Sequence, residues 1–193
     1  MKRYPGTVLT APQTSTEPAF AAFDQVLRMT GGITLSQLCD MTGLEPTTVQ
    51  NWVKRGWVPK PNGKRYGEQH MARVFLINAL KGALQLESIV ELLHYMNGNL
   101  NDTADDILHD RQLYDLFCRV AAAYEAGQSA EEAIEQATRA YDEVYEGARE
   151  KLQQALAVML PAYRAVLSKR KAELAFSKIK EELYHEKTKH CHG

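Results

Sequence analysis

The side chains with the clearest chemistry in this sequence are polar and basic, and they gather between residues 47 and 66. Gln50 and Asn51 carry amides, which can pair bidentately with the edge of an adenine, and a threonine methyl can contact thymine. Lysine and arginine side chains bind phosphate oxygens. The group predicts contact with double-stranded DNA, against the alternative of a solvated face on an interaction module. Its members are Thr47, Thr48, Gln50, Asn51, Lys54, Arg55, Lys64, Arg65 and Tyr66.

Two short helices joined by a glycine turn must position the first of these side chains. Thr34 is followed three residues later by Gln37, and this capping-box spacing predicts that a helix begins there. Gly43 can adopt the positive φ of a sharp turn, so the first helix ends at Thr42-Gly43. Pro46 suits the first position of a second helix, which runs to about Arg55, because a backbone N–H is not needed there. This arrangement is a helix-turn-helix.

The second helix has an apolar side made by Val49, Trp52 and Val53, which leaves its polar residues facing outward. After it, the basic segment 59–66 predicts a β-hairpin wing, because Asn62-Gly63 strongly favours a type I′ turn. Lys64 and Arg65 would contact phosphate or the minor groove from this wing. Tyr66 is expected half-buried at the base of the wing, with a hydroxyl that could still donate to phosphate.

These residues resemble the winged head of the MerR family of bacterial regulators over roughly residues 33–96. Excisionase-type proteins share the same head, and the whole chain is also similar to an uncharacterised bacterial family that joins such a head to a helical tail. The resemblance implies a DNA-binding head and places Trp52 as the aromatic of the recognition helix. It is carried by Cys39, Gly43-Leu44, Trp52, Gly56-Trp57-Val58-Pro59 and Lys64-Arg65-Tyr66, and by the helical segments 68–74 and 86–93.

The chain departs from the MerR pattern in its recognition helix. MerR relatives usually carry Arg and Tyr where this chain has Thr47, Gln50 and Asn51. The departure implies that different bases are read, or that base reading is weaker.

Outside the head the pattern is helical throughout, so the predicted fold class is all-α with a small hairpin wing. Residues 1–15 are expected to form a poorly ordered arm. Apolar spacing predicts helices over Thr16–Thr30, Glu68–Lys81, Leu86–Met96 and Asp102–Ala126.

A further helical run begins at Ser129, a good N-cap, and its apolar residues recur at nearly heptad spacing. Pro161 should kink or divide this run near Leu160. The spacing predicts a homodimer, although the same face could instead fold back against Asp102–Ala126 within one chain. The predicted dimer contacts are Tyr141, Tyr145, Leu152, Met159 and Tyr163.

Charge is distributed unevenly along the chain, although the net charge is only −1. Residues 34–95 hold seven Lys and Arg against five Asp and Glu, residues 101–160 hold five against thirteen, and residues 164–193 hold eight against four. The small basic excess of the head argues against a strong nonspecific grip on DNA by a single copy. Dimerisation would supply a second half-site.

Three isolated cysteines, Cys39, Cys118 and Cys191, do not form a disulfide framework. Cys39 and Cys118 fall on apolar helix faces and are expected to pack in the core. His185 and the terminal His190-Cys191-His192 have metal-binding chemistry, yet neighbouring ligands on a chain end make a poor preformed site.

Asp102, Asp105, Asp106 and Asp110 lack the glycine and glutamate of a calcium loop, and an acidic helix N-terminus explains most of them. We therefore predict no metal and no cofactor. We also predict no enzymatic activity, because no catalytic triad, phosphate loop or dinucleotide motif occurs. The absence of a signal peptide or membrane-spanning run predicts a cytoplasmic protein with no membrane partner.

The predicted organisation is an arm and helix (1–32), a DNA-binding head (33–96), a helical dimerisation or effector module (100–187) and a flexible tail (188–193). The predicted function is sequence-specific transcriptional regulation by a dimer, with its effector unknown. Two alternatives stay open: a protein-interaction adaptor whose head does not bind DNA, and a helical module that senses a ligand.

Overall fold

The computed structural model describes residues 3–10, 18–97 and 107–190, with side chains placed as far as residue 182. These residues form an all-α fold without a β-strand, which confirms the predicted class. The helices are α1 (Ala21–Thr30), α2 (Leu35–Thr42), α3 (Pro46–Lys54), α4 (Glu68–Leu80), α5 (Leu86–Asn97), α6 (Asp110–Glu125), α7 (Ala130–Thr138) and α8 (Ala148–His190).

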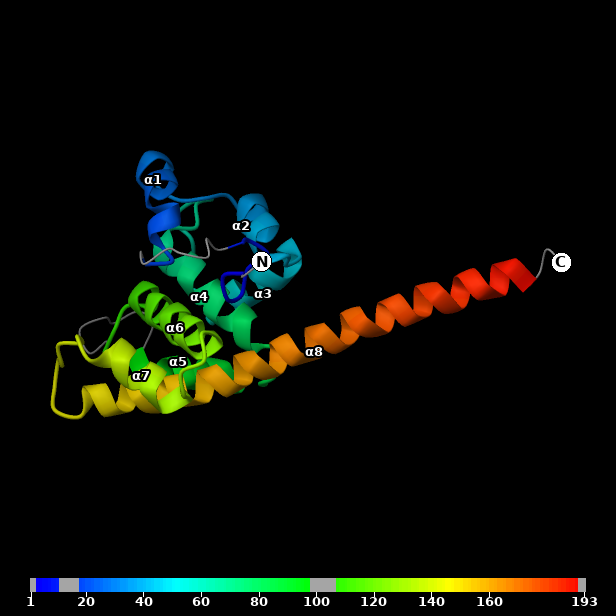
Figure 1. Cartoon of the computed structure of the whole chain (residues 1–193). Helices are drawn as coiled ribbons and strands as arrows, with labels where there is room; N and C mark the ends of the chain where they lie inside the picture. Colours follow the sequence, from blue (N-terminus) through cyan, green and yellow to red (C-terminus); the bar gives the residue numbers. More distant parts are fainter. Residues whose placement is uncertain (1–2, 11–17, 98–106, 191–193) are drawn as a thin grey trace.

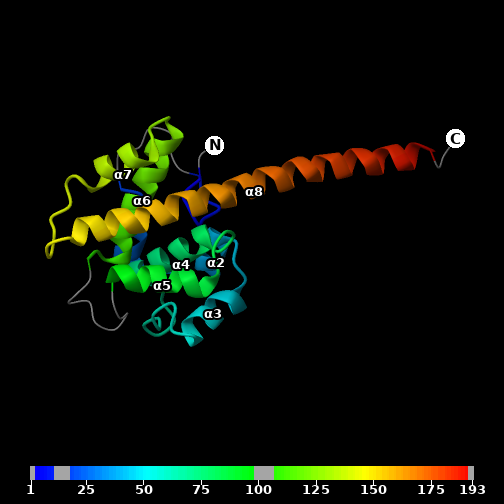
Figure 2. The same ribbon diagram turned by 90° about the horizontal axis from the view of Figure 1, so that it is seen from below.

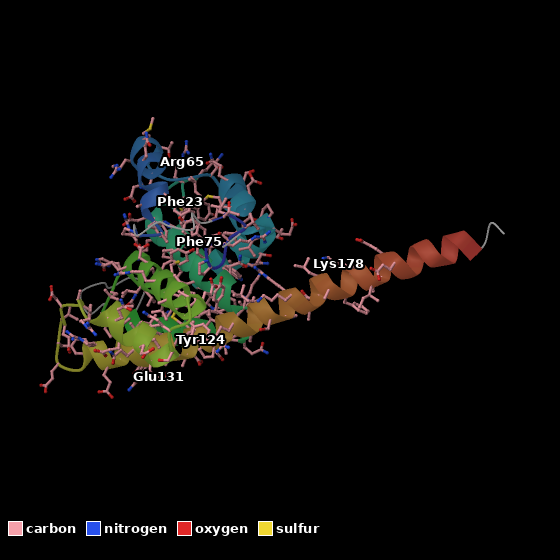
Figure 3. The ribbon with its side chains drawn as sticks, viewed as in Figure 1. Phe23, Arg65, Phe75, Tyr124, Glu131 and Lys178 are labelled. Carbon is pink, nitrogen blue, oxygen red and sulfur yellow. The ribbon has the colours of Figure 1, made fainter. Side chains whose placement is uncertain are left out.

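Helix α4 is the centre of the molecule. All of residues 71–80 are buried, and α4 packs against α2, α5, α6 and α8 (Figure 1). A helix that is apolar on nearly every side must be enclosed by other elements. Phe75 shows this, because its ring lies 5.9 Å from that of Phe23 on α1 and 5.4 Å from that of Tyr114 on α6 (Figure 3). The core is continuous from Ala19 to Tyr163 and crosses the boundary predicted between residues 96 and 100.

The helix-turn-helix forms as predicted, because its start and stop signals are local. The Thr34 hydroxyl accepts the Gln37 N–H, and the Gln37 side chain accepts the Thr34 N–H, so both halves of the capping box are present. Gly43 ends α2 at φ 69°, and Pro46 opens α3.

Two helices begin later than predicted. Pro18–Phe20 form a turn before α1, where the Phe20 N–H donates to Asp115 Oδ1 at 2.9 Å, and Thr16 lies outside the described residues. Helix α6 begins at Asp110, because the His109 N–H is capped by the Gln112 side chain at 3.2 Å. Asp102, Asp105 and Asp106 also lie outside the described residues.

The N-terminal segment 3–10 is packed rather than loose, so the prediction of a poorly ordered arm is wrong there. Gly6 has φ 72°, and a Cβ at this position would lie 2.0 Å from the Phe75 carbonyl oxygen, so only glycine allows the approach to α4. The Gly6 carbonyl accepts the Asn78 side-chain amide at 2.7 Å, and the Pro5 carbonyl accepts the Tyr114 hydroxyl at 2.7 Å. The Val8 N–H donates to the Met41 carbonyl of α2, which ties the segment to the head.

The segment 59–66 is a tight turn and not an extended hairpin. One bridge joins Asn62 to Arg65, and Tyr66 then pairs with Ile33 instead of continuing a ladder. Pro59 and Pro61 lack the N–H groups that a second strand would need. The turn also differs from type I′, since Gly63 has φ 61° and every described residue with a positive φ is a glycine.

The run that begins at Ser129 is two helices rather than one. Residues 139–147 connect α7 to α8, with Gly147 at φ 87°, and α8 folds back along α7 and α6. Pro161 does not interrupt α8. The carbonyl it leaves without an intrahelical N–H partner is that of the exposed Ala157, where water can satisfy it.

The predicted dimer seam is largely internal. Leu152 and Met159 are 0% exposed and Tyr163 is 5% exposed, because this face of α8 packs in the core of its own chain. The Tyr141 hydroxyl donates to the Ile107 carbonyl at 3.0 Å, whereas Tyr145 is exposed. A dimer through this whole face would require the core to open, so the surface is corrected to an intramolecular one.

Beyond the body, α8 projects as a single helix (Figures 1 and 2), and residues 168–182 are all exposed. The helix continues to His190, so residues 188–190 are not the flexible tail expected for them. A search of the described helices for a span long and apolar enough to cross a bilayer found none.

Candidate nucleic-acid interface

The outer face of α3 carries most of the side chains singled out from the sequence. Thr47, Gln50, Asn51 and Lys54 are exposed, and Thr48 is partly buried. On the opposite side of the same helix, Val49 is 0% and Trp52 3% exposed. The helix therefore presents a row of neutral hydrogen-bonding groups that ends in a lysine.

The helix is held from behind and at its end. The Trp52 carbonyl accepts the N–H groups of Trp57 and Val58 at 2.9 and 3.3 Å, which turns the chain back into the core. Val58 is fully buried. Figure 2 shows α3 and the loop after it on the side of α4 and α5 away from α8. The exposed row is thus fixed on a rigid support and faces away from the projecting helix.

Arg55 lies at the end of this row but is already engaged. Its guanidinium stacks over the Trp57 ring at 4.8 Å, and Nη1 lies 3.6 Å from Glu87 Oε1 on α5. Both charged side chains are more than 60% exposed, so water and salt weaken the pair. Arg55 can exchange Glu87 for a phosphate at little cost.

The turn after α3 places Lys64 and Arg65 in solvent, while Tyr66 is buried. Arg65 Nη1 donates to the Gly32 carbonyl at 3.2 Å, which orients its guanidinium. Tyr66 is 5% exposed and is held by two backbone hydrogen bonds to Ile33. Burial raises the pKa of its phenol, with a smaller contribution from Cys39. The predicted contact from Tyr66 to DNA is therefore corrected: this side chain supports the turn from inside.

A charged joint beneath the head was not found from the sequence. Arg73 Nε donates to the Trp57 carbonyl at 3.2 Å, and Nη1 donates to Asp110 Oδ1 on α6 at 3.0 Å. The two side chains are 1% and 3% exposed, and the Asn97 amide also donates to Asp110. Burial raises the pKa of the Asp110 carboxyl, and the Arg73 charge opposes this. The available signal was the position of an arginine inside an otherwise buried helical run.

The described residues contain no group of three metal-ligating side chains. Cys39 is buried in α2, where burial raises the pKa of its thiol, and Cys118 is partly buried on α6. Cys191 and His192 lie outside the described residues, as do the side chains of His185 and His190.

A protein-family model described as "Domain of unknown function (DUF1836)" matches residues 21–117, which is half of the chain. The chain belongs to the DUF1836 family. The matched region runs from the start of α1 into α6, so it contains the exposed row of α3, the tight turn and the Arg73–Asp110 joint.

The uncharacterized protein YkrK of Bacillus subtilis is 29% identical to this chain over 87 residues, which is 43% of this chain. The match spans 37% of the length of that relative. No solved structure shows a significant match.

Proposed function

We propose that this DUF1836 protein is a sequence-specific regulator of transcription that binds double-stranded DNA as a dimer, with a head that docks like that of MerR regulators. The observation that carries the proposal is the outer row of α3. Its amides and hydroxyls are exposed and held on a buried helix back, as an element that enters a major groove requires.

The side chains divide into two roles. Gln50 and Asn51 can each make two hydrogen bonds to one adenine, so they would read sequence. Lys54, Lys64 and Arg65 are exposed cations and would bind phosphates, which position the head without reading bases. The tight turn at 62–65 favours a contact with the sugar–phosphate backbone over deep insertion of a long wing.

A dimer follows from how few cations the head presents. Of the seven Lys and Arg in residues 34–95, Arg73 is buried in an ion pair and Arg55 is paired with Glu87. Few phosphate contacts give weak binding at physiological salt. A second head on a second half-site doubles both the phosphate contacts and the bases read.

Enrichment of a random duplex pool on the purified protein tests the proposal. We expect one motif to emerge, with two related halves, and with loss of enrichment when Gln50 and Asn51 are both changed to Ala. Asp40→Ala on α2 is an exposed control outside the row and should recover the same motif. A pool that stays random for the wild-type protein would contradict DNA recognition and leave the adaptor function as the better account.

A ligand-sensing role for the helical module is a second candidate, favoured by a groove of about 560 Å³ between segment 3–7, α6 and α8. Arg3, Arg164, Arg170 and Lys171 line it, over a floor that includes Leu160 and Tyr163. Cations above an apolar floor suit an amphipathic organic anion. Native mass spectrometry of protein purified from its own host should show a bound small molecule that Lys171→Glu releases, and an empty wild-type protein would count against this role.

A further inference from the structure

The far part of α8 exposes large apolar side chains without an intramolecular partner among the described residues. Leu174, Phe176 and Ile179 are 66, 57 and 50% exposed. An isolated helix is only marginally stable in water, and most helices in proteins are stabilised by packing one apolar face. A projecting helix that carries exposed phenylalanine and isoleucine therefore has the composition of one half of an interface.

The exposed apolar positions of α8 form one continuous face, opposite the buried one. Within the body, Leu152, Met159 and Val166 face the core, while Val158 on the other side is 45% exposed. From Val158 the exposed positions recur at steps of three and four, which is the spacing of a coiled-coil seam. We call this the outer face: Val158, Pro161, Ala165, Ser168, Ala172, Ala175, Phe176 and Ile179.

The charges around the two halves of α8 are complementary. Residues 168–190 contain seven Lys and Arg against four Asp and Glu. Residues 130–150, which form α7, the connection and the start of α8, contain two against seven. The α7 acids reach the near half of α8, since Gln153 donates to Glu135 on α7 at 3.1 Å. On the other flank, the Tyr95 hydroxyl of α5 donates to Gln154 at 2.8 Å.

We propose that the outer face of α8 binds the same face of a second copy of this chain, with the two α8 helices antiparallel. In this arrangement the basic far half of each helix lies over the acidic near half of its partner. A parallel pair would instead place the two basic far halves side by side and away from the acids, which costs Coulomb energy.

The positions of the apolar residues also fit an antiparallel pair. The midpoint between Val158 and Ile179 falls between Ser168 and Lys169, next to residue 169, the midpoint of α8. A pair centred there overlaps along both helices completely and brings Ile179 of each copy to Val158 of the other. Ala165 then faces Ala172 of the partner.

This surface gives a partner to the dimer of the proposed function, and it is tested without DNA, so the two proposals can fail separately. It also differs from the seam expected from the sequence, which lies on the opposite, buried side of α8. Since the side chains of the outer face are exposed, they can be replaced without disturbing the core.

Sedimentation of the full chain at about ten micromolar tests the occupant of the face. We expect the wild-type protein to have twice its chain mass of 21.7 kDa, and the variant Val158→Glu with Ile179→Glu to be a monomer with unchanged circular dichroism. Met29→Glu is the matched control, because Met29 is an apolar residue on α1 that is 78% exposed, and it should stay dimeric. A monomeric wild-type protein, or a dimer that survives both glutamates, overturns the proposal.

Oxidative crosslinking tests the orientation in a background where Cys118 and Cys191 are changed to Ser. A mixture of the Ala165→Cys and Ala172→Cys variants should form interchain disulfides, while neither variant does so alone. Crosslinks in the Ala165→Cys variant alone would show a parallel pair and overturn the antiparallel arrangement. If the outer-face glutamates lower duplex binding while the protein sediments as a monomer throughout, the face contacts DNA and the proposal is wrong.

Discussion

The joint beneath α3 and the row on its surface place chemically similar side chains in opposite surroundings. Arg73 lies one helix away from Lys54, yet Arg73 is 1% exposed and bound to Asp110, while Lys54 faces solvent. The cations of the head thus serve two purposes: some hold the head on the helical module, and others are available to a partner. A charge count along the sequence adds the two kinds together and overstates the basic surface of the head.

The largest expected effect comes from breaking the joint. Asp110→Ala would leave Arg73 charged, buried and unpaired, and removing one partner of a buried pair typically costs about 3–5 kcal/mol. Glu87→Ala removes the partner of the exposed Arg55 and should cost at most about 1 kcal/mol. Urea denaturation followed by circular dichroism measures both. Equal losses for the two variants would mean that the Arg73–Asp110 pair is not buried in solution.

The two faces of α8 give the next contrast. Leu152→Ala should cost about 2–5 kcal/mol, because its side chain is fully buried and the core cannot close over the cavity. Ile179→Ala should change the stability of the monomer by less than about 0.5 kcal/mol, because the residue is exposed. The measurement is thermal unfolding in the Val158→Glu background, which removes the proposed pairing. A large cost for Ile179→Ala in that background would show that this residue packs within its own chain.

The smallest expected effect is a pH dependence at the edge of the joint. Burial lowers the pKa of His94 below its ordinary value of 6.5, with Arg73 adding to the shift and Asp110 opposing it. Between the folded and ordinary pKa values the unfolded chain binds more protons, so stability falls as pH drops through this window. His94→Gln should flatten the dependence of the unfolding midpoint on pH below 6.5. Denaturation at pH 5 to 7.5 checks this, and an unchanged slope would place His94 in full solvent.

How far the sequence could predict this molecule depends on the range of the interactions involved. The ends of α2 and the start of α3 were predictable because the capping box of Thr34 and Gln37, the glycine at 43 and Pro46 act within a few residues. The exposed row of α3 followed from the same local periodicity. These features include most of the candidate interface.

The features that were missed depend on distant partners. Nearly heptad spacing in residues 134–166 shows that one face is apolar but cannot show whether it packs in its own chain or against another. The packing of segment 3–10 depends on the approach of Gly6 to Phe75, and the buried state of Arg73 depends on Asp110. The hairpin was overestimated because Asn62-Gly63 outweighed the missing N–H groups of the neighbouring prolines.

The central claim is that the head reads DNA through α3 and holds it through the cations beside it, and salt-dependent binding of the selected duplex separates these roles. The Gln50→Ala, Asn51→Ala variant should lose about 1–3 kcal/mol of specific affinity per lost bidentate contact and keep the wild-type dependence on salt. The Lys64→Ala, Arg65→Ala variant should bind every duplex more weakly, with a slope of log K against log salt reduced by about 0.9 per lost phosphate contact in each protomer. Circular dichroism must show both variants folded. If both pairs change affinity and slope alike, or if neither changes binding, the head does not dock on DNA through α3.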